Sequence, residues 1–441
     1  NTDEGLMTKF VSVTEDEILK AIDDYYLDKS KKEVLDESVQ ESIKKSLNEL
    51  EGITNADASS LPIQSLVEQL IMLGSAWKAS DIHINPQGSH VQVRYRVDGV
   101  LRSGPSVPIV LQDSIISRIK IMSKLNISER RLPQDGKITF KKDKLDLDLR
   151  VSTMPITHGE NVVIRILEKN RLFSLRSLGF DRRILKTVEE SINKTFGLFL
   201  VTGPTGSGKS TTLYSCLKSM NAIEKNIVTI EDPVEYQLPF IRQSQVNHAI
   251  EYTFAKGLRA FLRHDPDVIL VGEIRDVETA EMAVHSAQTG HLVLSTLHTN
   301  TALGAIPRIL YMGVDLFMLS TVLNGVLAQR LMRALCPYCK KPYESTPKES
   351  EWLGRPGKVI KLYKPTGCKK CKYEGYKGRR GVHELFAPDD DIRNLMLNKV
   401  NEIELKKACK KKGMVFFKED ATNKVLEGST DIVEAVRVLP E

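Results

Sequence analysis

The first half of the chain alternates apolar and polar positions in several short stretches. Residues 91–97 place Val, Val, Tyr and Val on one side and Gln and Arg on the other, and residues 145–151 repeat this alternation. Such a period of two predicts half-buried strands, and Asp98-Gly99 is a typical hairpin turn. Helical spacing of apolar residues separates these stretches. We therefore expect a small α+β domain over residues 56–168.

The second half has a different pattern, in which short apolar runs alternate with helical stretches over residues 178–441. The candidate strands are 198–202, 226–230, 268–272 and 292–296. Continuous apolar runs of this length predict a parallel α/β sheet that is covered on both faces. Residues 169–177 are interpreted as a linker and 320–335 as a helix. A cysteine-bearing loop region follows over 336–380, and the chain ends in helices.

Residues 1–55 are highly charged but carry one apolar helical face. That face comprises Ile18, Leu19, Ile22, Tyr25 and Tyr26. The pattern fits either a docking helix or a solvated linker helix, and both interpretations remain open. The chain begins with Asn1 and not with Met, so we expect a further region upstream.

Composition and charge change this picture little. With 41% hydrophobic and 27% charged residues, the chain is typical of globular proteins. A net charge of +6 over 441 residues is a mild bias and does not by itself indicate nucleic-acid binding. No apolar run reaches the length of a membrane span, and the first residues lack the apolar core of a secretory signal.

The strand at 198–202 leads into the sequence GPTGSGKS, which fits the phosphate-loop pattern G-x-x-x-x-G-K-[ST]. The candidate nucleotide-binding residues are Gly203, Pro204, Thr205, Gly206, Ser207, Gly208, Lys209, Ser210 and Thr211. Glycines bring consecutive N–H groups close to phosphates, and the helix that follows adds partial positive charge. Lys209 can reach the β- and γ-phosphates, and the Ser210 hydroxyl can ligate Mg²⁺. The loop predicts binding of Mg²⁺ and a nucleoside triphosphate.

Acidic residues follow two other predicted strands. Glu273 comes after an apolar run and Gly272, whereas Glu231 and Asp232 end the strand at 226–230. Carboxyl ends of parallel strands meet at the nucleotide edge of a sheet, so these acids are expected near the phosphates. Many ATPases have Asp where this chain has Glu273, so we expect Glu273 to act mainly on the attacking water.

Two histidines frame the next strand, because His291 opens it and His298 closes it. A lone histidine is commonly a core residue. His298, however, ends a short apolar strand like the two strands that are followed by Glu231 and Glu273. We expect His298 to contact the γ-phosphate or Glu273 and to sense hydrolysis. For His291 the sequence leaves a structural and a functional role equally open.

Four cysteines form two C-x-x-C pairs. They are Cys336, Cys339, Cys368 and Cys371. Two such knuckles give four thiolates to one tetrahedral Zn²⁺, and neighbouring lysines would offset the negative charge. A site with four protein ligands has no open position, so we expect a structural zinc site.

At this point the chain resembles the secretion-type ATPases that drive type II secretion and type IV pilus assembly. In the second domain the matching stretches are the phosphate loop, TIEDPVEY (229–236), RHDPDVILVGEIRD (263–276) and TGHLVLSTLHTN (289–300). In the first they are SDIHI (80–84), RLPQDGK (131–137) and LRVSTMP (149–155). The paired C-x-x-C motifs match the assembly and export branch of this family.

The resemblance implies a RecA-like P-loop ATPase domain that follows a smaller, PAS-like α+β domain and includes a tetracysteine zinc subdomain. It implies a homohexameric motor on the cytoplasmic face of the inner membrane, which contacts the membrane through a platform protein and a cytoplasmic recruitment protein. Glu231, Glu273 and His298 match the family's catalytic motifs, and Arg150 matches an arginine that the small domain lends to the site. The family usually has an Arg where this chain has Lys137. A lysine is a point charge and cannot bind a phosphate through two parallel hydrogen bonds as an arginine does.

Two other functions compete with this one. A RecA-like nucleic-acid translocase would carry interleaved aromatic and basic residues, yet aromatic residues make up only 6% of the chain. We therefore expect no nucleic-acid partner. The second competitor is a nucleotide-gated scaffold that binds ATP with little turnover.

Overall fold

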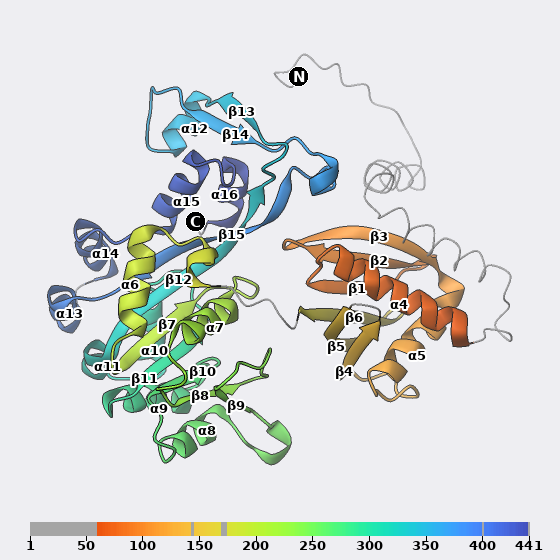
Figure 1. The fold of residues 1–441 in the computed structure, drawn as a ribbon, viewed down its shortest axis with the longest axis horizontal. Helices are drawn as coiled ribbons and strands as arrows, with labels where there is room; N and C mark the ends of the chain where they lie inside the picture. The colour runs from red at the N-terminus through yellow and green to blue at the C-terminus, as the bar shows by residue number, and fades with distance from the viewer. Residues whose placement is uncertain (1–59, 143–144, 169–173, 399–400, 440–441) are drawn as a thin grey trace. The chain divides into compact units, whose positions relative to one another are not determined.

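The computed structural model of the protein consists of two compact units, residues 1–169 and 170–441. The described residues are 60–142, 145–168, 174–398 and 401–439. The helix expected within residues 1–55 lies outside the described residues. Each unit buries hydrophobic residues of its own, and its helices and strands are labelled in Figure 1.

The first unit is a six-stranded antiparallel sheet in the order β3-β2-β1-β6-β5-β4. Its strands are β1 (Asp81–Pro86), β2 (His90–Val97), β3 (Val100–Pro108), β4 (Gln134–Lys142), β5 (Leu145–Ile156) and β6 (Gly159–Glu168). Helices α4 (Ser60–Ala76) and α5 (Gln112–Met122) cover one face, where the Tyr95 hydroxyl donates to the Leu70 carbonyl at 3.1 Å. The predicted alternation is confirmed, because the apolar side of β2 is buried.

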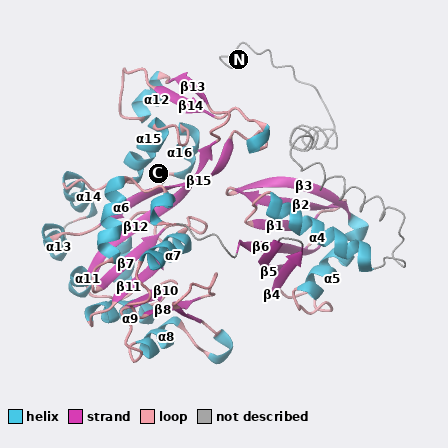
Figure 2. Cartoon of the chain, in the orientation of Figure 1, coloured by secondary structure: helices cyan, strands magenta, loops and turns pink. Residues whose placement is uncertain are grey.

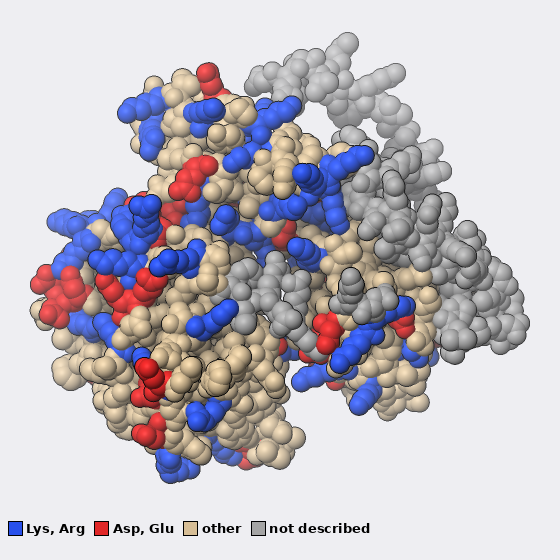
Figure 3. Space-filling view, in the orientation of Figure 1, with Lys and Arg blue, Asp and Glu red and all other residues tan. Residues whose placement is uncertain are grey.

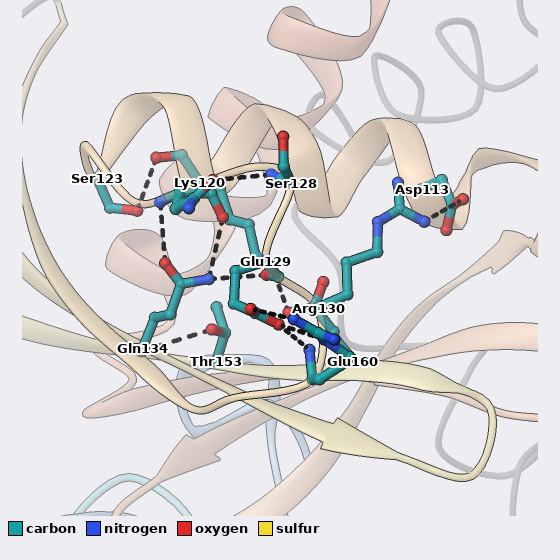
Figure 4. Close-up of polar contacts among 11 residues, drawn as sticks. Asp113, Lys120, Ser123, Ser128, Glu129, Arg130, Gln134, Thr153 and Glu160 are labelled. Carbon is teal, nitrogen blue, oxygen red and sulfur yellow. Dashed lines mark hydrogen bonds and ion pairs between the residues drawn. The ribbon is translucent and has the colours of Figure 1, made fainter.

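The loop between α5 and β4 is held in place by a buried lysine (Figure 4). The Lys120 Nζ donates to the Glu129 carbonyl at 2.7 Å and lies 2.5 Å from Oε1 of Glu160. The Gln134 amide donates to the carbonyls of Asn126 and Glu129, at 3.0 and 2.9 Å. These contacts fix the start of β4 relative to α5 and β6.

The second unit is a seven-stranded sheet in the order β15-β12-β7-β11-β10-β8-β9. Its strands are β7 (Gly197–Thr202), β8 (Ile227–Glu231), β9 (Arg242–Gln245), β10 (Val268–Val271), β11 (Leu292–Leu297), β12 (Leu323–Leu335) and β15 (Tyr376–Phe386). All neighbouring pairs are parallel except β12 and β15. The four strands expected from apolar runs are confirmed as β7, β8, β10 and β11.

Helices cover both faces of this sheet (Figure 2). They are α6 (Arg182–Ile192), α7 (Lys209–Ser219), α8 (Phe254–Phe261), α9 (Val277–Gln288), α10 (Ala305–Tyr311), α11 (Leu316–Val322), α13 (Asp390–Leu397), α14 (Glu402–Lys411), α15 (Phe417–Leu426) and α16 (Ile432–Val438). Along β7, Phe199 and Val201 pack with α6 and α7, whereas Leu198 and Leu200 face the core that α8 to α11 complete. Among the described residues, no helix is long and apolar enough to cross a bilayer.

The helix predicted over residues 320–335 is wrong. The short helix α11 ends at Val322, and the next thirteen residues form β12, which pairs with β7 on one side and β15 on the other. A strand with neighbours on both edges and cores on both faces has no period of two, so its apolar positions do not reveal it.

Residues 336–380 were expected to be a loop region, but they contain regular structure. The strands β13 (Lys341–Glu344) and β14 (Lys361–Lys364) form a two-stranded antiparallel sheet, and α12 (Pro347–Trp352) lies between them in sequence. Thr346 begins α12 with a capping box, since its hydroxyl accepts from the Glu349 N–H while the Glu349 carboxylate accepts from the Thr346 N–H.

Candidate functional site

The phosphate loop connects the end of β7 to the first turn of α7. Gly206 and Gly208 have φ of 79° and 89°, values that favour glycine. The Lys209 Nζ donates to the carbonyls of Gly203 and Pro204, at 2.9 and 3.2 Å, so the lysine folds back over its own loop. The loop therefore has the turn that a phosphate chain requires, with its cation beside it.

Glu273 follows β10, and the charge of its carboxylate acts on Lys209. Burial lowers the pKa of Lys209, and the Glu273 carboxylate raises it in partial compensation. The Glu273 side chain is 12% exposed, and its Oε2 lies 2.6 Å from Nε of Arg275 and 3.5 Å from Nε2 of His298. Of the two contacts expected for His298, the γ-phosphate or Glu273, the structure thus shows the approach to Glu273.

Two hydroxyl groups of β11 fix the strand end that carries Glu273. The Ser295 hydroxyl donates to the Val271 carbonyl, and the Thr296 hydroxyl donates to the Gly272 carbonyl, both at 2.8 Å. All four residues are close to the carboxyl ends of their strands. The backbone that leads into Glu273 is therefore fixed by β11.

Glu231 lies in a buried hydrogen-bond network. Its carboxylate accepts hydrogen bonds from the hydroxyl groups of Tyr214 on α7 and Thr229 on β8, the latter at 2.6 Å. The Gln243 amide of β9 donates to it at 3.2 Å. Burial raises the pKa of Glu231 against the effect of these donors. These partners tie Glu231 to α7, and its expected role at the phosphates stays a prediction.

Asp232 and His291 have partners of their own. Asp232 accepts from Nε2 of His248 at 3.2 Å in an exposed pair. His291 precedes β11, at the opposite end of the strand from His298, and its Nδ1 lies 2.9 Å from the Ser286 carbonyl. The structure therefore favours a structural role for His291.

Arg150 lies in the first unit, on the sheet face opposite α4 and α5. Cross-strand register places it beside Lys137 of β4 and Arg165 of β6. The same row continues through Asp81 of β1 to Arg96 of β2. Asp81 binds Arg165 at 2.9 Å between Oδ1 and Nε. Four cations and one acid thus form a transverse row across five strands, a surface that suits a phosphate group.

The four cysteines of the C-x-x-C pairs converge. Their Sγ atoms all lie within 4.8 Å of one another, and three of the separations are 3.7–3.9 Å. A tetrahedral Zn²⁺ with bonds of about 2.3 Å separates its sulfurs by about 3.8 Å, so the cluster fits that ion. The Cys371 Sγ also accepts N–H groups from Cys368 and Gly375, both at 3.2 Å.

The surroundings of this cluster are strongly basic. Residues 336–380 contain thirteen Lys and Arg but only four Glu, an excess that more than offsets the −2 charge of a zinc tetrathiolate. Lys and Arg side chains are prominent over β13, β14 and α12 in Figure 3. The cluster therefore has sulfur atoms at the spacing that Zn²⁺ requires, and basic residues around them that offset the negative charge of the thiolates.

Two residues of the candidate site were not singled out from the sequence. Arg275 lies within the matched stretch GEIRD, but only the structure shows its contact with Glu273. Gln329 of β12 donates from Nε2 to the Ser207 carbonyl at 2.6 Å. The wrong helix prediction removed any reason to consider Gln329, because it placed that residue away from the sheet.

Comparison with known proteins decides the family. The model of the type II/IV secretion system protein family matches residues 56–437. The chain belongs to this family. The type II secretion system protein E of Dickeya dadantii (strain 3937) is 47% identical over 381 residues, which cover 86% of this chain and 76% of that protein. The type IV pilus assembly ATPase PilB of Thermus thermophilus is 44% identical over 427 residues, or 96% of this chain and 48% of that protein.

A solved structure supports the fold. The pilus retraction motor PilT with bound ADP has a TM-score of 0.57 at 27% identity, over 84% of this chain and 96% of PilT. Its nucleotide agrees with the phosphate loop seen in this member of the secretion system family. The RecA-like α/β fold expected from the sequence is thereby confirmed.

Proposed function

We propose that the protein is a Mg²⁺-dependent ATPase, a hexameric motor that powers type II secretion or type IV pilus assembly. The observation that carries this proposal is the placement of Lys209 after β7 and Glu273 after β10, at the carboxyl ends of two strands that flank β11 in one parallel sheet. A cation for the phosphates and a carboxylate for the attacking water are the two groups that hydrolysis requires. Family membership supports the same activity.

Different residues of the chain have separate roles in hydrolysis. The N–H groups of residues 206–211 bind the phosphates, and Lys209 leaves its loop carbonyls to contact the β- and γ-phosphates. Glu273, held by the strand end, orients the attacking water and accepts its proton. The Ser210 hydroxyl would hold Mg²⁺, which supplies charge neutralisation at the phosphates when bound.

His298 and Arg275 act through Glu273. Because both contact the same carboxylate oxygen, they restrict where that oxygen can point. Loss of the γ-phosphate would change the charge beside His298, so this residue can report hydrolysis to the segment that follows β11. Glu231 contributes by holding α7 through Tyr214.

The second half of the site comes from the sheet of another copy. Lys209 is the only loop cation, and the developing charge on the γ-phosphate needs more than one. Arg150, in the basic row of the first unit, supplies it from a neighbouring subunit of a homohexamer. The motor works at the cytoplasmic face of the inner membrane, where a platform protein and a recruitment protein connect it to the membrane.

The four cysteines bind one structural Zn²⁺. The closed set of four thiolates leaves no position for a substrate, so the ion stabilises residues 336–380 and takes no part in hydrolysis.

Phosphate release by the assembled oligomer tests the proposed activity. Glu273→Gln is expected to lower turnover at least about 100-fold, because the amide cannot accept the proton of the attacking water. Glu281→Gln, which changes an exposed carboxylate of α9, is the matched control and should retain wild-type turnover. Turnover of Glu273→Gln within a few-fold of wild type would remove Glu273 from the mechanism.

The same assay separates the competing functions. A wild-type oligomer that binds ATP but releases almost no phosphate would be the nucleotide-gated scaffold. Strong stimulation by single-stranded or double-stranded nucleic acid would instead support a translocase, whereas we expect none. The low aromatic content and the family both favour the motor.

A further inference from the structure

Gln329 is a buried polar side chain that touches the phosphate loop from a different strand. It is 2% exposed and lies on β12, the strand that pairs with β7. Its Nε2 donates to the Ser207 carbonyl at 2.6 Å, and its Oε1 accepts from the Thr212 hydroxyl at 2.8 Å. One amide therefore joins the loop to the first turn of α7.

The two partners determine which way the amide points. The Ser207 carbonyl can only accept, so it must face Nε2, and the Thr212 hydroxyl then donates to Oε1. Thr212 is itself fixed, since its N–H donates to the Gly208 carbonyl at 3.0 Å. Gln329 thus closes a ring of hydrogen bonds around the last residues of the loop.

This ring fixes the direction of one peptide group of the loop. In a planar trans peptide the C=O and N–H point to opposite sides. The Ser207 carbonyl points toward Gln329, so the N–H of Gly208, in the same peptide group, points away from β12. That N–H is one of the donors that a phosphate loop offers to its ligand.

The backbone of β12 also lies against the loop. A Cβ on Gly203 would lie 2.4 Å from the Gln329 carbonyl oxygen, and one on Gly208 would lie 3.1 Å from Gln329 Nε2. Real Cβ atoms almost never come as close as the first of these distances. The two glycines therefore serve the approach of β12 as well as the turn of the loop.

We propose that Gln329 is a positioning residue that holds the phosphate loop in its nucleotide-accepting shape before the nucleotide arrives. The proposal rests on the nucleotide-binding role of the loop in the proposed function. Without Gln329 the Ser207–Gly208 peptide can rotate, and the nucleotide must then select the one competent orientation. The apparent affinity falls by the fraction of loops in that orientation.

Nucleotide affinity, measured with a fluorescent ATP analogue and the full-length chain, tests this proposal. Gln329→Met keeps the length of the side chain but removes both hydrogen bonds, and should raise the Kd about tenfold. Thr212→Val removes only the hydroxyl, and should raise the Kd about two- to fivefold. At saturating ATP both variants should keep kcat within about threefold of wild type, because Lys209 and Glu273 remain.

Asn324→Leu is the matched control on the same strand. Asn324 is also buried and donates to a backbone carbonyl, that of Phe196 at 2.9 Å, but it lies beside the start of β7, away from the loop. This variant should lower thermal stability as much as Gln329→Met does, yet leave the Kd unchanged. A merely structural role for Gln329 would make the two variants alike.

Each outcome has one meaning. A Kd within twofold of wild type in both Gln329→Met and Thr212→Val overturns the proposal, as does an equal rise in Asn324→Leu. If Gln329→Met does not fold, the Kd of Thr212→Val is compared with that of Asn324→Leu. A higher Kd in Thr212→Val alone supports the proposal, and equal Kd values overturn it. A wild-type chain that binds no nucleotide would contradict the proposed function itself, a result distinct from failure of Gln329.

Discussion

The tetracysteine cluster and the proposed phosphate site are built in opposite ways. The cluster takes all four ligands from residues 336–371 of one chain, and their sulfurs already lie at tetrahedral spacing. The phosphate site takes a loop after β7, a carboxylate after β10, a histidine after β11 and an amide from β12. Even then it has only Lys209 as a loop cation.

The difference shows that a metal site with four protein ligands can be predicted from the local spacing of its residues. A site that binds and releases a substrate depends on how distant strands are ordered in the sheet. A zinc site needs only four thiolates, and two C-x-x-C knuckles supply them. A phosphate site must bind, react and release, so it needs groups that meet only when strands are correctly ordered and, in our proposal, when two copies meet. The two sites should therefore fail independently of each other.

Removal of the loop lysine should give the largest effect on one site alone. Lys209→Ala is expected to lower turnover by about 10²–10³-fold, because the charge on the γ-phosphate loses its main partner within the chain. Metal analysis of the same protein should still find about one Zn per chain. Loss of zinc together with turnover would show that the two sites are not independent.

Removal of two zinc ligands tests the same comparison from the other side. Cys336→Ser combined with Cys339→Ser should abolish zinc binding and lower the unfolding midpoint by roughly 10 °C, since metal binding supplies folding energy. The Kd for nucleotide should change by less than about threefold, because the sites share no ligand. A tenfold rise in the nucleotide Kd would mean that loss of the zinc site affects the phosphate loop through β12, the strand that runs from Gln329 to the cysteines.

The two sites should also respond to pH in opposite directions. Burial lowers the pKa of Lys209, so its ammonium loses the proton below the ordinary lysine value of 10.5. Nucleotide affinity should thus be full near neutral pH and weaken as the pH rises toward 10. Zinc should be lost as the pH falls, because thiolates must take up protons. A nucleotide Kd that is constant from pH 7 to 10 would contradict the role of the Lys209 charge.

Much of both sites was predictable from local sequence. The phosphate loop, the acid at Glu273 and the four cysteines each follow from a short pattern whose chemistry allows few residue types. The neighbouring ends of β7, β10 and β11 also followed, because parallel strands share one carboxyl edge. His298 was expected to contact the γ-phosphate or Glu273, and its Nε2 lies 3.5 Å from the Glu273 carboxylate.

What the sequence did not reveal depends on β12. Its apolar residues Leu323, Val326 and Leu327 have helical spacing, and Gly325 is the only breaker in the run. Pairing with β7 and β15 overrides this local preference. Once the strand is taken for a helix, Gln329 cannot be placed at the loop. The direction of Glu231, toward Tyr214, is equally a property of packing that no motif records.

A mixing experiment tests most directly the central claim that each phosphate site is completed by another copy. Chains with Lys209→Ala lack the loop cation, and chains with Arg150→Ala lack the borrowed one, so each variant alone should be almost inactive. Mixed in equal amounts and reassembled, they form intact sites at roughly a quarter of the interfaces of a random ring. We predict that phosphate release recovers to about that fraction of wild type. A mixture no more active than either variant alone would contradict the claim.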